Sequence, residues 1–559
     1  MRLLRINGQN VDLDESTAIG VTYQGYDIKS PAVRKVKISN SFTIPKTDNN
    51  LQIFGYPQNP QSISKKVYGK NIANYWVDNE QLITNAKVRA DSVGKRIKIF
   101  VFQKDDVWDS IKKVLWPDFV KDFVKWMQEE NSLPSKENPF IGSFSDFITP
   151  YTTAEEGIKL PFSFGNLYNY APYIDSEDVF LEDFNSLYLR FWPDGSDENI
   201  KQDKADGGHF FVYCKTIFQY IEYKYDVDFL TSGGVKVGNI WDDQIAPKLY
   251  IPVKDLGIRF SYSGSSISGF YFEFNEDTKF LPLKDQKDKA DKKLYDFAIA
   301  FMQIFNIVQD DFGDNQTRLA RFDDITTLAE VTDWSGNYTN LDDINFEPSI
   351  NGFSQENTIK FKTIHEEGDE LLNSKTLTCL NKNLDASNDL FSIDAYVPSF
   401  LNIVGGVVPD LSPKEAFKTF CFMLDSGLTE QAINIYSSEN GNEQSAIAYL
   451  QKPALYSLDS EYNTLDSIIK YPRYYEVDRW LTLNDVKDLE YFRLYWIKEL
   501  NGSYFLNKIS GFNPQKANKA TKLELIYVND KTPVTPPTLD YWADGVNDAF
   551  TDGDGDYWF

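Results

Sequence analysis

The sequence predicts an α+β, β-rich, multidomain protein, with barrel-like or sandwich-like β domains at both ends and a few amphipathic helices packed on sheets between them. Three observations lead to this class. Short alternating apolar segments between turn residues occupy both ends of the chain, and apolar stripes with helical spacing occupy its middle. The length of 559 residues, with 42% hydrophobic and 15% aromatic residues, is enough for several packed cores.

Residues 1–104 are expected to form the N-terminal β domain. The dipeptide Asn7-Gly8 favours a type I′ hairpin turn, because asparagine and glycine both accept a positive φ. The last strand of this domain alternates apolar side chains on one face. Strands are expected at residues 2–6, 10–13, 34–39, 41–45 and 96–102.

Residues 105–205 are expected to form a helical pair that caps the first domain, followed by an irregular, insertion-like region. Val107 and Ile111 share one face of the first helix, and Pro117 suits the first turn of the second helix. From residue 131 onward, Asn, Ser, Pro, Gly and aromatic residues follow one another without sustained periodicity. The pattern therefore predicts no particular element there.

Residues 206–335 are expected to form a mixed domain of helices and strands. One helix is expected over 209–225 and another over 291–308, each with a broad apolar stripe. Stripes of this width are typical of helices packed on a sheet. This interpretation is preferred to a cofactor site.

Residues 336–530 are expected to form the C-terminal β-rich domain or domains, because short strands alternate with turn signals again. The strongest pair of strands covers 503–509 and 521–528. Residues 531–559 begin with the stiff, Pro-rich linker KTPVTPP and continue as an acidic, aromatic tail.

The chain as a whole is strongly acidic. It has 57 Lys and Arg against 83 Asp and Glu, a formal net charge of -26. A surface with this balance repels a phosphate backbone, so specific nucleic-acid binding is not expected. There is no apolar run of about 18 residues, so we expect neither a membrane span nor a signal peptide, and synthesis in a cytoplasm.

Residues that carry chemistry are few. Cys214, Cys379 and Cys421 are widely spaced and are expected to be buried thiols in a reducing compartment. The two histidines, His209 and His365, are too few for a His-rich metal centre. The sequence lacks the G-x-S-x-G, Walker A, H-E-x-x-H and C-x-x-C motifs, so we expect no catalytic residue, no cofactor and no enzymatic activity.

Calcium is the one metal that a pattern in the sequence suggests. Asp552, Asp554 and Asp556 have the spacing of the first half of an EF-hand loop. Tyr557 stands where the loop needs glycine, and the bidentate glutamate of the twelfth position is missing. A solvated acidic tail is therefore preferred to a structural Ca²⁺ site.

Four blocks of the chain carry a family resemblance. The first holds DIKSP (27–31), RK (34–35) and SNSFTIPKTDNN (39–50), with Phe54. The others are 213–228 with 248–252, 296–308 with 333–334, and 504–509 with 521–525. In this order they resemble blocks of the tail hub or baseplate-type structural proteins of tailed bacteriophages that infect Bacteroidetes.

The resemblance implies a structural virion protein that forms a symmetric hub or baseplate ring, joining the tail tube to the tail tip. It implies a homo-oligomer in the virion tail, assembled in the host cytoplasm. Implied partners are the tail tube, the tape measure and tail fibre or baseplate components. Aromatic residues of the C-terminal tail are expected to dock on a neighbouring subunit or another tail protein, with packing on the chain itself as the alternative: Tyr541, Trp542, Tyr557, Trp558 and Phe559.

Two other functions stay open. A peripheral receptor-binding or glycan-binding tail protein also uses clustered Tyr and Trp, which stack on sugar rings. A tail-associated cell-wall hydrolase needs only two carboxyls at a suitable separation, and Asp and Glu are abundant here. Density on the tail axis would distinguish the hub from the adhesin, and clearing of host wall in a zymogram would identify the hydrolase.

Overall fold

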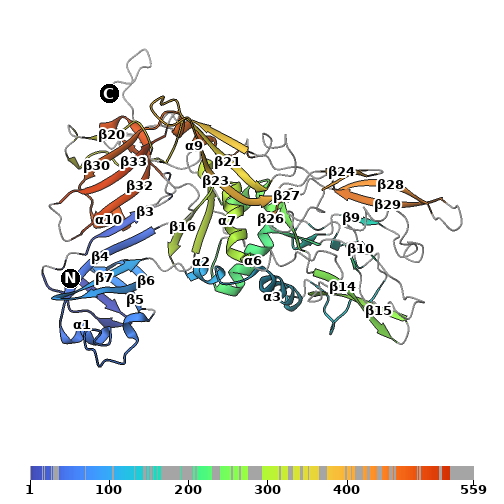
Figure 1. Cartoon of the computed structure of the whole chain (residues 1–559), viewed down its shortest axis with the longest axis horizontal. Coiled ribbons are helices and arrows are strands. Elements are labelled where there is room, and N and C mark those ends of the chain that lie inside the picture. Colours follow the sequence, from blue (N-terminus) through green and yellow to red (C-terminus); the bar gives the residue numbers. More distant parts are fainter. Residues whose placement is uncertain are drawn as a thin grey trace, which may run out of the picture.

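A 14-stranded sheet at one end of the molecule and a group of helices at its centre organise the fold (Figure 1). The computed structural model has seven α-helices and many strands in the part of the chain that it describes. The α+β, β-rich class predicted from the sequence is confirmed. The structure describes residues 2–15, 17, 19–24, 26, 28, 37–69, 71–102, 106–130, 133–142, 147, 150–151, 154, 156–159, 162–164, 189–190, 206–207, 210–229, 239–253, 256–263, 266–274, 292–313, 316–324, 331–339, 341, 344–350, 352–363, 374–396, 400–403, 406–409, 420–424, 428–436, 443–451, 458, 461–487, 489, 493–514 and 519–528.

The N-terminal strands begin with the predicted hairpin. Asn7 and Gly8 have φ values of 51° and 78°, and a type I′ turn requires both to be positive. The hairpin is confirmed, although its second strand ends at Asn10, and the strands expected at 34–39 and 41–45 form one strand. The elements are β1 (Arg2–Ile6), β2 (Gln9–Asn10), β3 (Val21–Gln24), β4 (Lys37–Pro45), α1 (Asp48–Ile53), η1 (Lys66–Tyr68), β5 (Asn71–Val77), β6 (Glu80–Val93) and β7 (Arg96–Phe102).

These strands bury one face and leave the other outward. Every second side chain of β5 is buried, and the side chains between them are half-buried. In β7 the alternating Ile97, Ile99 and Val101 are buried, as the sequence predicts. Burying a branched side chain of this size stabilises the fold by about 1.5–3 kcal/mol. The outward face carries polar and aromatic side chains.

The C-terminal strands belong to the same sheet. β3 pairs antiparallel with β32, so that Val21 lies opposite Phe512 and Gln24 opposite Lys508. The strand order is β19-β30-β33-β32-β3-β4-β7-β6-β5-β1-β2, with β18 and β31 beside β32 and β20 beside β30. Two parts of the sheet curl as half-barrels, one from the N-terminal strands and one from the C-terminal strands (Figure 1). Segments expected to form two separate β domains therefore share one sheet, and the exact domain boundaries stay predictions.

The strand pair expected near the end of the chain is confirmed. β32 and β33 are antiparallel neighbours, with Phe505 opposite Ile526 and Ile509 opposite Leu523. The elements of this region are β18 (Val331–Asp333), β19 (Tyr338–Thr339), β20 (Asn345–Glu347), α9 (Asn463–Lys470), β30 (Tyr474–Arg479), α10 (Leu483–Lys487), β31 (Leu494–Ile497), η12 (Lys498–Leu500), β32 (Gly502–Phe512) and β33 (Thr521–Tyr527).

Four of the helices, α2, α3, α6 and α7, lie at the centre of the molecule (Figure 1). α2 contacts α7, and α3 contacts α6 and the hairpin strand β15. The two helices predicted to cap the N-terminal domain therefore pack in the centre instead. The elements are α2 (Asp106–Ile111), α3 (Trp116–Glu129), β12 (Phe210–Tyr213), α6 (Cys214–Tyr225), η4 (Ile240–Asp242), η5 (Ala246–Lys248), β13 (Leu249–Val253), α7 (Leu294–Ile304), β16 (Ile307–Gly313) and β17 (Gln316–Arg321).

Both central helices are shorter than the sequence predicts. The helix expected from 209 begins only at Cys214, because Phe210–Tyr213 pairs as a strand with β13 and β8. The helix expected to reach 308 ends at Ile304. Asn306 has a left-handed φ of 49°, which ends a right-handed helix and turns the chain into β16.

Aromatic rings fill the space between the helices. Phe301 of α7 lies 5.3 Å from Phe218 of α6 and 5.5 Å from Trp241, measured between ring centroids. Trp116 of α3 joins the cluster, with its ring 5.7 Å from that of Phe297. Tilted and edge-on ring pairs at such distances add about 0.5–1.5 kcal/mol each beyond the area they bury.

The remaining strands extend away from the large sheet (Figure 1). β21 and β23 are parallel neighbours, whereas β28 and β29 form a long antiparallel hairpin. None of the helices among the described residues is long and apolar enough to cross a membrane. The elements are β8 (Ile158–Lys159), β9 (Phe162–Phe164), β10 (Leu189–Arg190), β11 (Asp206–Gly207), β14 (Leu256–Ser263), β15 (Ser266–Phe274), β21 (Glu356–Thr363), β22 (Ser374–Thr378), β23 (Ser387–Tyr396), β24 (Phe400–Ile403), β25 (Gly406–Pro409), β26 (Phe420–Cys421), β27 (Met423–Leu424), β28 (Leu428–Tyr436) and β29 (Glu443–Gln451).

Candidate functional site

The site residues predicted from the C-terminal tail lie outside the described residues. The Ca²⁺ site and the docking role of the aromatic side chains therefore stay predictions, and so do the roles of both histidines. The residues concerned are Asp552, Asp554, Asp556, Tyr541, Trp542, Tyr557, Trp558, Phe559, His209 and His365.

Two of the three cysteines are buried, as predicted. Cys214 and Cys379 are free thiols within the core. Burial raises the pKa of the Cys214 thiol well above its ordinary value, which keeps it protonated and unreactive. The backbone of Cys421 lies in β26, and its side chain is outside the described part. Neither described cysteine is suited to act as a nucleophile.

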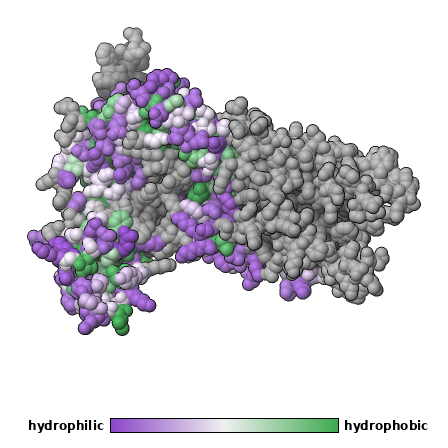
Figure 2. Space-filling model, viewed as in Figure 1, coloured by the Kyte–Doolittle hydropathy of each residue, from purple (hydrophilic) through white to green (hydrophobic). Residues whose placement is uncertain are grey.

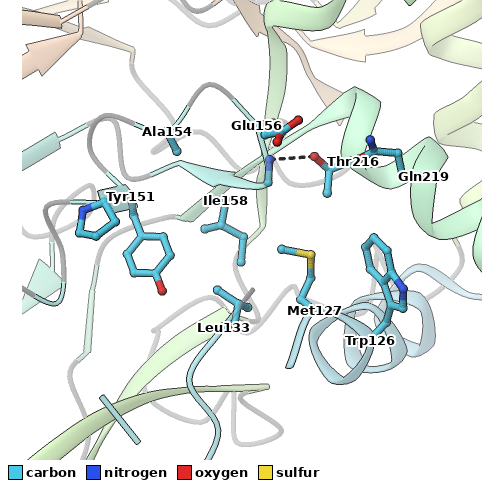
Figure 3. Close-up of a pocket in the computed structure, with 11 residues that line it drawn as sticks. Trp126, Met127, Leu133, Tyr151, Ala154, Glu156, Ile158, Thr216 and Gln219 are labelled. Atoms are coloured by element: carbon cyan, nitrogen blue, oxygen red, sulfur yellow. Dashed lines mark hydrogen bonds between the residues drawn. The ribbon is translucent and has the colours of Figure 1, made fainter. Parts of the chain in front are cut away.

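A cavity of about 300 Å³ lies between α3, α6 and the segment around residues 150–158 (Figure 3). Its walls combine apolar side chains, among them Met127 from α3, Tyr151 and Ile158, with a similar area of polar surface. Glu156, Thr216 and Gln219 supply polar side chains at the wall. The cavity has the size and lining to take a small apolar group.

Two hydrogen bonds hold the backbone of the cavity wall, whereas the buried Trp126 Nε1–H in the lining has no hydrogen-bond partner. Thr216 Oγ1 accepts the Gly157 N–H at 2.8 Å (Figure 3), and the Tyr213 hydroxyl donates to the Ala154 carbonyl at 2.8 Å. Burial raises the pKa of Tyr151 to about 12, so its phenol stays neutral. Among the described lining residues, we find no nucleophilic side chain paired with a second residue that could act as its general base.

A buried ion cluster links the centre of the molecule to α9. Arg321 Nη2 lies 3.1 Å from Asp243 Oδ2, and Arg321 Nη1 lies 3.6 Å from Glu461 Oε1. The guanidinium also lies 5.0 Å from the centroid of the Phe305 ring. Since β17, the residue that follows η4 and the turn before α9 each supply one member, the cluster fixes how these elements meet. No described Asp, Glu, His or Cys residues gather in a group of three that would hold a metal ion.

The outward face of the N-terminal strands is basic and aromatic. We name it the basic sheet face, and define it by six residues. Arg5 Cζ lies 5.5 Å from the centroid of the Trp76 ring, and Arg89 Cζ lies 5.8 Å from that of Phe100. The side chain of Arg89 is 65% exposed and that of Lys98 is 48% exposed. The face consists of Arg5, Trp76, Lys87, Arg89, Lys98 and Phe100.

One carboxylate lies among these cations. Asp91 Oδ2 accepts from Lys98 Nζ at 2.8 Å, and Arg89 Nη2 lies 3.8 Å from Asp91 Oδ1. The hydrogen bond from Lys98, together with the positive charge of the ammonium, lowers the pKa of Asp91. Asp91 is therefore ionised and offsets one of the positive charges on the face.

A loop of residues 54–70, between α1 and β5, exposes two large apolar side chains. Ile63 is 97% exposed and Tyr68 is 88% exposed. Hydrogen bonds within the loop fix its path: the Ser62 hydroxyl donates to the Gly55 carbonyl at 2.7 Å, and the Asn71 amide donates to the Lys66 carbonyl at 3.0 Å. η1, which holds Tyr68, contacts β6. Residues 54–69 of this loop are therefore ordered and lie beside the N-terminal strands.

Charge is divided unevenly along the chain. Residues 1–104 contain 16 Lys and Arg against 8 Asp and Glu, a net charge of +8. The totals of 57 and 83 leave 41 and 75 for residues 105–559, a net charge of -34. The net charge of the whole chain conceals this asymmetry. A charge count restricted to the N-terminal segment is the sequence signal that reveals a basic surface there.

Comparisons with known proteins give few matches. No protein-family model matches the chain, and no curated protein matches it. Among solved structures, the chain is similar to a 43 kDa tail protein of prophage MuSo2 from Shewanella oneidensis, with 10% sequence identity and a TM-score of 0.32. The match covers 94% of this chain and 98% of that chain. A TM-score of 0.32 is below the range in which two chains share a fold.

Proposed function

We infer that the protein is a structural component of a bacteriophage tail, and that it forms a symmetric hub or baseplate ring joining the tail tube to the tail tip. The role is mechanical, since a ring subunit acts through its shape and its contacts. The observation that carries the proposal is the order of the four sequence blocks that resemble such proteins, together with the place of those blocks in the fold.

The blocks supply the framework of the molecule. The first contains most of β4 and the first residues of α1, and the last contains parts of β32 and β33; β3 lies between β4 and β32 in the sheet. The second and third contribute α6, β13 and α7 to the centre. Trp334 of the third block stacks on Tyr495 of β31, with ring centroids 4.0 Å apart. The resemblance therefore falls on residues that hold the fold together.

The large sheet also suits a subunit that is completed by its neighbours. Its path runs from β19 to β2 without closing on itself, and both of these edge strands are two residues long. Open edges of curled sheets are sites where another chain adds or packs, and short edge strands limit uncontrolled pairing. Rotational repetition of one subunit around an axis would cover such edges in a ring.

The position of the protein in the particle tests the proposal. We expect a cryo-EM reconstruction of the virion to show this chain as a closed ring around the tail axis, between the tube and the tip. If the density lies at the periphery and the purified protein binds host glycans, the protein is an adhesin rather than a hub subunit. If the purified protein clears host cell wall in a zymogram, it is a cell-wall hydrolase.

A further inference from the structure

We propose that the basic sheet face and the adjoining 54–70 loop of one subunit dock on the acidic surface of residues 105–559 of a second copy. The contact is head-to-tail, because the two surfaces are different patches of the same chain. It rests on the ring proposed above, since it supplies the contact by which neighbouring subunits would join. The charge counts of the two parts of the sequence, and the exposed side chains of the described residues, carry the argument.

The opposite net charges of the two parts of the chain favour a second copy as the partner. The N-terminal segment has a net charge of +8, and the remainder of the chain has a net charge of -34. Two copies that meet through like regions would repel each other, whereas an N-terminal face against the remainder of another copy is attractive. Heterologous contacts of this kind close into rings when the rotation between subunits allows it. The acidic partner that the face needs is thus present in every copy of the chain.

The side chains of the face are those that protein interfaces prefer. Arg5 and Arg89 lie over the rings of Trp76 and Phe100. A guanidinium held on a ring keeps its donors outward and loses little freedom when a carboxylate binds. Arg, Trp and aromatic residues are enriched at the centres of interfaces, where they contribute most of the affinity.

The 54–70 loop supplies apolar anchors next to these charges. Ile63 and Tyr68 are almost fully exposed, although the loop around them is held by its own hydrogen bonds. An ordered loop that presents large apolar side chains to water marks an interaction site. Since the loop is already folded, docking would cost little conformational entropy.

A protein surface fits these features better than a nucleic acid does. The aliphatic side chain of Ile63 has no complement on a phosphate backbone, whereas it fits an apolar pocket of another subunit. Asp91 also stands within the face, next to Lys98, where it would repel phosphates. Both features are compatible with an acidic protein surface that includes basic residues of its own.

Sedimentation of the purified full-length chain tests the electrostatic part. We expect concentration-dependent association that weakens at least about tenfold as the salt concentration rises from about 50 mM to about 500 mM. The triple variant Arg5→Glu, Lys66→Glu, Arg89→Glu changes two residues of the basic sheet face and one of the loop, and should lose at least about tenfold in association constant at low salt. A matched control makes the same change of charge at three exposed lysines of the acidic part of the chain, and should not weaken association, because it makes that part more acidic: Lys113→Glu, Lys125→Glu and Lys382→Glu.

A second pair of variants tests the apolar anchors. Ile63→Ser combined with Tyr68→Ser should weaken association about tenfold at both salt concentrations, because no charge changes. Ile141→Ser is the control, since Ile141 is 81% exposed but lies outside the loop. Circular dichroism and thermal melting should show that all these variants fold as the parent does, because each replaced side chain is at the surface.

Three results would overturn the proposal. The first is that the parent protein stays monomeric at low salt. The second is that the triple variant and its charge control lose association equally. The third is that the basic sheet face binds a DNA oligonucleotide more tightly than it binds a second copy of the chain. The outcome is separable from that of the ring proposal. A peripheral position in the virion would remove the hub role and leave salt-dependent association intact, whereas a monomeric parent would remove only this contact.

Discussion

The N-terminal strands and the central helices bury their side chains in opposite ways. β1, β5 and β7 each bury one face and leave the other outward. In α7, eight of the eleven residues are buried, so this helix has almost no outward side. A helix that is apolar all round belongs to a closed core. The open strand face is free to meet another molecule, and the central cluster has its contacts within the chain.

Charged side chains also differ between the two regions: cations are exposed on the N-terminal strands, whereas an ion cluster is largely buried in the centre. Figure 2 shows hydrophilic and hydrophobic residues mixed over the surface of the region that holds the N-terminal strands. This region holds the exposed cations Arg89 and Lys98 as well as the exposed Ile63 and Tyr68. In the centre, the charged Arg321 is surrounded by Asp243, Glu461 and an aromatic ring. Substitutions in the centre should therefore change stability, and substitutions on the N-terminal face should change association.

The largest expected effect is on the central aromatic cluster. Phe301→Ala should lower the free energy of unfolding by about 3–5 kcal/mol, because it removes a fully buried ring and leaves a cavity. Tyr68→Ala, which removes a ring that is 88% exposed, should change it by less than about 0.5 kcal/mol. Urea denaturation followed by fluorescence measures both. Similar losses for the two variants would contradict the division between a closed core and an open face.

A smaller difference is expected between two tryptophans. Trp108 is 2% exposed, and its Nε1–H donates to Gln309 Oε1 at 2.7 Å. Trp108→Phe should cost about 1–3 kcal/mol, because the buried amide oxygen loses this donor and the smaller ring packs less well. Trp76→Phe on the basic sheet face should cost less than about 0.5 kcal/mol. Chemical denaturation of the two variants measures the loss in the free energy of unfolding. An equal loss for both would indicate that other parts of the same chain cover the basic sheet face.

The Asn7-Gly8 turn should show a backbone effect of about 1 kcal/mol. Gly8 has a φ of +78°, and nothing lies within 4 Å of the position that a Cβ would take. Gly8→Ala should therefore destabilise through conformational strain alone. Gly94→Ala is the control, since that site is also open and has no positive φ. Thermal melts should separate the two variants, and equal melting temperatures would mean that the hairpin frays without consequence.

The smallest expected effect depends on pH. Lys522 donates to Glu476 at 2.6 Å; the hydrogen bonds from Lys522 and Asn345 lower the pKa of Glu476 below its ordinary value of 4.5. Because the folded-state pKa is the lower one, the stabilisation is present above the unfolded pKa and is lost as pH falls through the folded pKa. Glu476→Gln should cost about 0.2–1 kcal/mol at pH 7.

The pH dependence provides the check on this prediction. The difference between Glu476→Gln and the parent should shrink as the pH falls below 4.5, and it should also shrink in high salt. Denaturation curves at several pH values measure it. A difference that persists in acid would mean that side-chain packing, rather than ionisation of Glu476, supports this part of β30.

Local chemistry allowed much of the fold to be predicted from sequence. Asn7-Gly8 fixes its turn because two consecutive positive φ values suit few residues. The strand over 96–102 is confirmed at both ends, because strict alternation with one buried face leaves no other register. Pro117 stands in the first turn of α3 as predicted, because its missing N–H costs nothing there.

The other parts of the fold could not be predicted from sequence, because they depend on contacts between segments that are distant in the chain. Phe210–Tyr213 is apolar enough to continue a helix, and only its partners β13 and β8 make it a strand. The left-handed turn at Asn306 likewise depends on strand pairing, since the chain must turn there for β16 to pair with β17. The basic sheet face also depends on tertiary structure: its residues come from four different strands, although a charge count by segment would have indicated it.

The pairing of β3 with β32 has a consequence during synthesis. The two strands are separated by more than 480 positions in the chain, so β3 has a neighbour on only one side until the long intervening segment has been made. At the usual 5–20 residues per second, translation of the intervening segment takes about 25–100 s. During that interval an unpaired strand edge is open to other nascent chains. Many copies made close together in one cell would need protection at this edge before β32 is made.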